Sequence, residues 1–105
     1  MIIAKVSKKQ GFYYSFTCEG HAGYDDYGKD IVCAAVSMLV INTANSIDEL
    51  TSNDIEADNK EHISWRFKSC PDDKATLLMD SLLLGLHEIQ RQYGKKYFRL
   101  IIEEV

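Results

Sequence analysis

A chain of 105 residues, 46% of them hydrophobic, is expected to form one domain around one hydrophobic core, here taken as residues 1–105. Its formal net charge of -4, without any block of lysine and arginine, disfavours the phosphate contacts of direct nucleic-acid binding. Its three cysteines are too few and too widely spaced for a disulfide framework, and no C-x-x-C pair suggests structural zinc.

Nothing in the sequence predicts export or membrane insertion. Residues 1–6 lack the apolar region of a signal peptide. No apolar run approaches the ~20 residues that a helix needs to span a bilayer. We therefore expect a cytoplasmic protein, in a compartment where free thiols persist.

The N-terminal third predicts a hairpin followed by a loop. Residues 2–6 form a short run rich in β-branched side chains, and residues 12–19 alternate aromatic with small polar ones, so each is predicted to be a strand. Gly11 suits the turn between them, because it adopts positive φ without strain. Residues 20–30 hold three glycines and no periodic pattern, and we expect a mobile loop there.

The next segment, residues 31–50, predicts a long helix. It is too long for a strand, and its apolar residues lie almost all round, which is typical of a central buried helix. Asp30 is well placed as its N-cap, since a carboxylate there accepts hydrogen bonds from the first backbone N–H groups.

The C-terminal half predicts three more strands and a second helix. Residues 54–58 and 62–67 form a candidate hairpin, and residues 71–93 form a helix that begins at proline and ends before Gly94. Residues 97–104 form the last strand. The order ββ-α-ββ-α-β predicts a two-layer α+β fold, with two long helices on one face of a mostly antiparallel sheet of about five strands.

One constellation could carry chemistry. If Asp30 caps the helix, Cys33 lies in its first turn, where backbone N–H groups and the helix dipole stabilise a thiolate. A charge in the first turn gains only ~0.3–1 kcal/mol, so a second group is needed, and His21 across the loop is the candidate base. The N–H groups of the same turn could also stabilise an oxyanion.

Structural roles compete with these assignments. Cys33 could simply pack in the core, because free cysteine is among the most buried residue types. For Asp30, the role of helix cap is favoured over that of the third residue of a catalytic triad. Ser37, one turn after Cys33, could support the site or only pack. Tyr24 and Tyr27 could line a substrate groove or cover the core. The remaining cysteines and histidines have no partner visible in the sequence and are assigned to structure: Cys18, Cys70, His62 and His87.

The same residues resemble the signature of a known family. Eleven residues separate the histidine from the cysteine, and the likeness extends over essentially the whole chain. The family is the ribosomal-processing cysteine protease Prp family, and the segments that carry the resemblance are Gly20-His21-Ala22, Gly28-Lys29-Asp30 and Ile31-Val32-Cys33-Ala34-Ala35-Val36-Ser37.

The resemblance implies a cysteine endopeptidase that removes the N-terminal extension of a bacterial large-subunit ribosomal protein, number twenty-seven. The cut would follow an aromatic-aromatic-small segment, by way of an acyl-enzyme, in a homodimer without metal or organic cofactor. His21 would be the base and Cys33 the nucleophile, with Asp30 and Ser37 at further motif positions. The substrate loop would include Gly20, Ala22, Gly23, Tyr24, Tyr27 and Gly28.

Two other functions stay open on the residues alone. The chain could be a non-enzymatic module that binds a ribosomal protein, in which case Cys33 would be sealed in the core. It could also be a thiol redox sensor, which requires Cys18 or Cys70 close enough to bridge Cys33. A protease requires His21 and Cys33 to come within hydrogen-bond reach after a modest loop movement.

Overall fold

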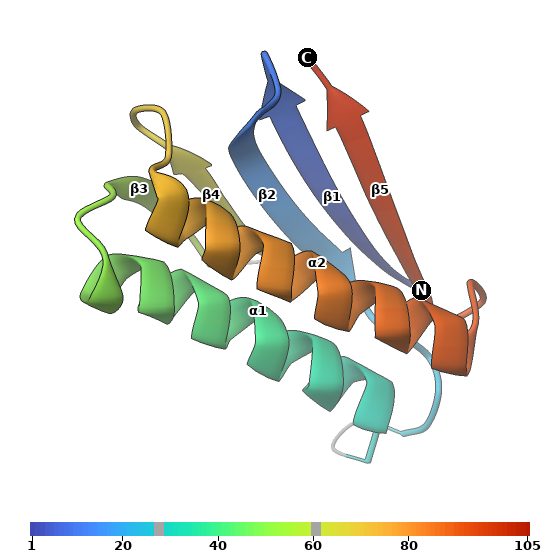
Figure 1. The fold of residues 1–105 in the computed structure, drawn as a ribbon. Helices are drawn as coiled ribbons and strands as arrows, with labels where there is room; N and C mark the ends of the chain where they lie inside the picture. Colours follow the sequence, from blue (N-terminus) through green and yellow to red (C-terminus); the bar gives the residue numbers. More distant parts are fainter. Residues whose placement is uncertain (27–28, 60–61) are drawn as a thin grey trace.

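The computed structural model describes residues 1–26, 29–59 and 62–105, and it confirms the predicted order of elements (Figure 1). The predicted helix over 31–50 matches to the residue, while each of the other elements differs from its prediction at one end only, by one to three residues. The elements are β1 (Ile2–Lys9), β2 (Phe12–Gly20), α1 (Ile31–Leu50), β3 (Ile55–Asp58), β4 (Ile63–Phe67), α2 (Asp73–Tyr93) and β5 (Phe98–Glu104).

The strands form one sheet in the order β3-β4-β2-β1-β5. Every neighbouring pair is antiparallel except β1 with β5, which is parallel. The parallel pair requires a crossover, and α2 provides part of it. Both helices cover the same face of the sheet (Figure 1), so the predicted two-layer α+β fold is confirmed.

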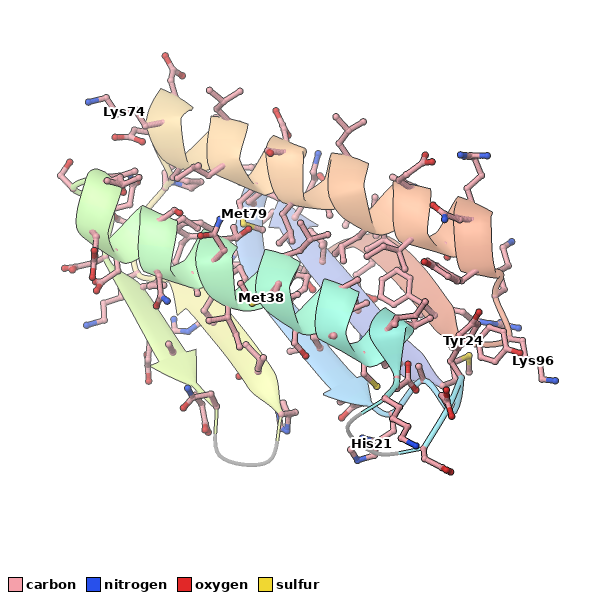
Figure 2. All side chains as sticks on the ribbon, turned by 90° about the horizontal axis from the view of Figure 1, so that it is seen from below. His21, Tyr24, Met38, Lys74, Met79 and Lys96 are labelled. Carbon is pink, nitrogen blue, oxygen red and sulfur yellow. The ribbon has the colours of Figure 1, made fainter. Side chains whose placement is uncertain are left out.

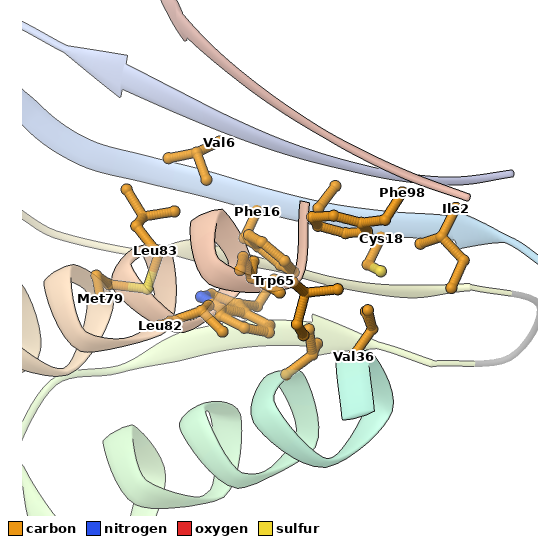
Figure 3. Close-up of a cluster of buried hydrophobic side chains, with 14 of the residues drawn as sticks. Ile2, Val6, Phe16, Cys18, Val36, Trp65, Met79, Leu82, Leu83 and Phe98 are labelled. Atoms are coloured by element: carbon orange, nitrogen blue, oxygen red, sulfur yellow. The ribbon is translucent and has the colours of Figure 1, made fainter. Parts of the chain in front are cut away.

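The core lies between the sheet and the helices (Figure 3). Phe16 and Trp65 are directly paired across β2 and β4, and their rings stack with centroids 4.6 Å apart. Both side chains are fully buried, as are Met79, Leu82 and Leu86 from α2. Large apolar side chains from both layers therefore fill one continuous core.

Helix α1 is less buried than the sequence suggested. One stripe of five residues faces inward: Val32, Val36, Val40, Thr43 and Ile47. On the outer side, Met38 is 67% exposed and Leu50 is 70% exposed. The expectation of a central buried helix is wrong for the single chain, because a two-layer fold has no element to cover the outside of its helices.

The apolar character of α1 also bears on membranes. Among the described residues, it is the one helix long and apolar enough to cross a bilayer, whereas no such span is predicted from the sequence. A core helix of a globular protein passes the same test, and the buried stripe of α1 packs on the sheet and on α2. The fold thus leaves an apolar helix face open to contact with another molecule.

Candidate active site

Asp30 joins the loop to the start of α1. It is the N-cap residue, as predicted, and its Oδ1 accepts hydrogen bonds from the backbone N–H groups of Val32 and Cys33, each at 3.0 Å. Its Oδ2 accepts from the N–H groups of Tyr24 at 3.0 Å and Asp25 at 3.4 Å. One carboxylate therefore fixes both the first helical turn and the middle of the loop.

These bonds keep Asp30 charged. Burial acts to raise the pKa of Asp30, but the N–H groups of Cys33, Tyr24 and Asp25 outweigh it and hold that pKa below its ordinary value. The stabilisation is therefore present at neutral pH and is lost as the pH falls through the lowered pKa. Both oxygens are occupied by these donors, and among the described residues none of the hydrogen bonds of Asp30 involves His21.

Cys33 sits at the third position of α1 and is half-buried, so its sulfur is not sealed in the core. The backbone N–H of Ala22 donates a hydrogen bond to its Sγ at 3.3 Å. A hydrogen bond to sulfur favours the thiolate over the neutral thiol. The loop thus contacts the reactive atom through its main chain.

The start of α1 offers fewer free donors than the sequence suggested. The N–H groups of Val32 and Cys33 already bond to the Asp30 carboxylate, and the N–H of Ala34 donates to the Asp30 carbonyl at 3.1 Å. Each N–H group carries one proton to donate. Of the donors just described, the N–H of Ala22 is the one directed at the sulfur.

His21 and Cys33 line the same cavity, which has a volume of about 720 Å³. His21 is exposed, near the start of α1 (Figure 2), and its side chain makes no hydrogen bond with the described residues. No hydrogen bond with the described residues therefore fixes the orientation of this ring. Other predicted residues lining this cavity are Gly20, Gly23, Asp30 and Ser37.

Gly20 has a structural reason to be glycine. It ends β2 with φ of 95°, a region that side chains rarely adopt, and an added Cβ would lie 2.3 Å from the Met1 carbonyl oxygen. The positive φ of Gly20 sets the direction in which the chain leaves β2 toward His21. Gly20 therefore serves the path of the backbone into the site.

The other residues predicted to form the substrate loop differ in how they relate to the cavity. Ala22 is buried and contributes its backbone to the site. Tyr24 does not line the cavity; its ring lies 5.5 Å from that of Tyr93 and 5.0 Å from that of Tyr97, between centroids. Tyr27 and Gly28 lie outside the described residues.

The structure adds residues that sequence reasoning missed. The pairing of Cys18 with Ile63 brings the start of β4 beside the end of β2, so Cys18, Ile63 and His62 line the cavity with His21 and Cys33. No spacing rule connects His62 to the loop, because their proximity depends on the register of a sheet. Apolar residues from three elements, including Ile2 and Val36, complete the lining.

Cys18 lines the same cavity as Cys33, but its protonation state makes it a poor partner in a redox switch. Burial, and then the charges of Cys33 and Glu19, raise the pKa of Cys18 to about 11, so it remains a thiol at neutral pH. Cys70 is exposed and lies before α2, outside this cavity. Among the residues that the structure describes, no three His, Cys, Asp or Glu side chains gather as metal ligands would.

The chain is similar to a known family of proteins. The family model described as "Cysteine protease Prp" matches residues 1–98. The ribosomal processing cysteine protease Prp of Staphylococcus aureus (strain Mu50) is 36% identical over 80 residues, which cover 73% of this chain and 76% of that protein.

Solved structures show the same fold. The S. aureus Prp with a covalently linked product peptide superimposes with a TM-score of 0.89 at 30% identity, covering 97% of this chain and 99% of that one. The complex of S. aureus Prp with a substrate peptide gives a TM-score of 0.84 at 28% identity, with the same coverage.

Proposed function

This chain belongs to the family of ribosomal processing cysteine proteases named Prp, and from that premise we propose that it removes the N-terminal extension of large-subunit ribosomal protein number twenty-seven. Residues 1–105 would form one protease domain acting in the cytoplasm, where ribosomes are assembled. The observation that carries the proposal is one cavity lined both by Cys33, at the first turn of α1, and by His21. A covalently bound product peptide in the S. aureus relative supports it.

In the proposed mechanism, His21 takes the proton from Cys33 and the thiolate attacks the carbonyl carbon of the scissile bond. The backbone N–H of Ala22, which points at the sulfur, stabilises the oxyanion of the tetrahedral intermediate. His21 then protonates the leaving amine, which departs and leaves a thioester on Cys33. Water, deprotonated by His21, hydrolyses that thioester and restores the thiol.

The lining of the cavity suits an aromatic substrate. Ile2, Val36 and Ile63 provide apolar surface, while His21, His62 and other polar residues lie around the sulfur. An aromatic side chain of the peptide would bury its ring against the apolar part and leave its carbonyl beside Cys33. This arrangement fits a cleavage sequence that contains two aromatic residues and one small residue.

We expect the purified protein to shorten the full-length ribosomal precursor at a single site near its N-terminus. Sequencing the new N-terminus of the product would locate the cut at the aromatic-aromatic-small segment. A precursor in which both aromatic residues are replaced by alanine is the matched control and should stay intact. Equal cleavage of both precursors would contradict the proposed specificity.

We also propose that two copies associate through the exposed face of α1. Replacing Met38, which is 67% exposed, with aspartate should raise the dissociation constant of the dimer at least ~100-fold, because an unpaired charge is costly in an apolar interface. Sedimentation or light scattering at several protein concentrations would measure the change. Phe12→Asp, at an exposed apolar position in the β1–β2 hairpin, is the control; a dimer unaffected by Met38→Asp would place the interface elsewhere.

A further inference from the structure

Tyr24 connects the loop to the far end of α2. Its ring meets the rings of Tyr93 and Tyr97 edge to face, at interplanar angles of 82° and 75°. Edge-to-face contact is a favoured geometry for aromatic pairs. Figure 2 shows Tyr24 at the end of the molecule where Lys96 follows α2, and the ammonium of Lys96 lies 5.7 Å from the Tyr97 ring centroid.

The main chain of Tyr24 is held as well. Its N–H donates to Asp30 Oδ2 at 3.0 Å, while two residues earlier the N–H of Ala22 donates to Cys33 Sγ at 3.3 Å. Between them lies Gly23, with φ of 69° and no atom within 4 Å of where a Cβ would stand. Because packing at Gly23 does not hold this part of the loop, it is restrained by the residues on either side: the buried Ala22, and Tyr24 through its ring contacts and its bond to Asp30.

We propose that Tyr24 is a positioning residue, whose ring, seated on Tyr93 and Tyr97, keeps the Ala22 N–H against Cys33 Sγ. The inference rests on the proposed function, because its benefit is catalytic. The hydrogen bond stabilises the thiolate before attack, and the same N–H lies close to where the oxyanion forms afterwards. Tyr24 does not line the cavity, so it acts through Ala22 and not on the substrate.

The reactivity of Cys33 measures this effect directly. Alkylation by iodoacetamide, followed at Cys33 by peptide mass spectrometry over a range of pH, reports how readily the thiolate forms. For Tyr24→Ala we expect the midpoint of that profile to rise by roughly 1–2 pH units, the scale of one lost hydrogen bond to a charged group. On a peptide substrate, kcat should fall about tenfold with little change in KM.

Two variants serve as controls. Tyr24→Phe keeps the ring and should behave like the native protein. Phe12→Ala removes an exposed aromatic ring in the β1–β2 hairpin and should also leave the profile unchanged. Tyr93→Leu removes one of the two rings beneath Tyr24 and should move the midpoint in the same direction as Tyr24→Ala.

Distinct results would overturn the inference. If Tyr24→Ala changes KM alone, Tyr24 is a substrate contact; if it lowers only the melting temperature, Tyr24 is a structural residue. In both cases the alkylation profile of Cys33 would match that of the native protein. If instead alkylated Cys33 still supports peptide cleavage, the proposed function fails, while the pH profile still decides the role of Tyr24.

Discussion

Replacing Cys33 with alanine is expected to abolish trimming of the ribosomal precursor, with a loss in kcat of at least ~10⁴-fold, because the attacking sulfur is gone. The fold should persist, since alanine is the best helix former and Cys33 is only half-buried. Single-turnover cleavage of the precursor, with circular dichroism of the variant, measures both effects.

The other cysteines provide the control for this result. Cys70 is exposed and outside the cavity, so Cys70→Ala should cleave at the native rate. Mass spectrometry should find an acyl adduct on Cys33 in the native enzyme, and none in Cys33→Ala, when a slowly hydrolysed peptide is supplied. A native cleavage rate for Cys33→Ala would remove Cys33 from the mechanism.

Local signals predicted the parts of the fold that local interactions determine. The first helix was placed to the residue because its cap, Asp30, lies one position before it. The structure extends β1 three residues beyond the predicted end, because Ser7 and Lys8 also pair with β5 and Lys9 pairs with Phe12 beside the turn. Pairing with β5 joins residues far apart in sequence, and no local pattern indicates it.

The outer face of α1 shows a second limit of sequence reasoning. Apolar residues all round a helix indicate that all its sides are covered, but they do not say by what. The sheet and α2 cover one stripe, and Met38 stays exposed. The pattern is better explained by a partner molecule than by a deeper core, which is why the dimer proposal starts from this face.

Some residues of the candidate site could be found from the sequence and others could not. His21, Asp30 and Cys33 lie within one short segment, so motif and helix-cap reasoning could find them. His62 could not be found, because it enters the cavity through the pairing of β4 with β2. The ring contacts of Tyr24 could not be predicted either. Tyr93 and Tyr97 follow it by some seventy residues and reach it only through the packing of α2.

Replacing His21 with alanine is expected to lower kcat by ~10²–10⁴-fold, the range that general acid–base catalysis contributes. The binding surface for the peptide remains, so KM should change little. Added imidazole should restore part of the activity, because a small base can occupy the space that the side chain leaves. The pH profile of kcat/KM should also lose the limb that reports the imidazole.

A second histidine lines the cavity, so the choice of His21 as the base must be tested against it. His62, the residue before β4, lines the same cavity and is the alternative base, whereas His87 is exposed on α2 and outside the cavity. We expect His87→Ala to be fully active and His62→Ala to retain most of kcat. If His62→Ala loses activity and His21→Ala keeps it, then His62, beside the sheet, is the base that takes the proton from Cys33. The loop would then serve Cys33 only through the main chain of Ala22.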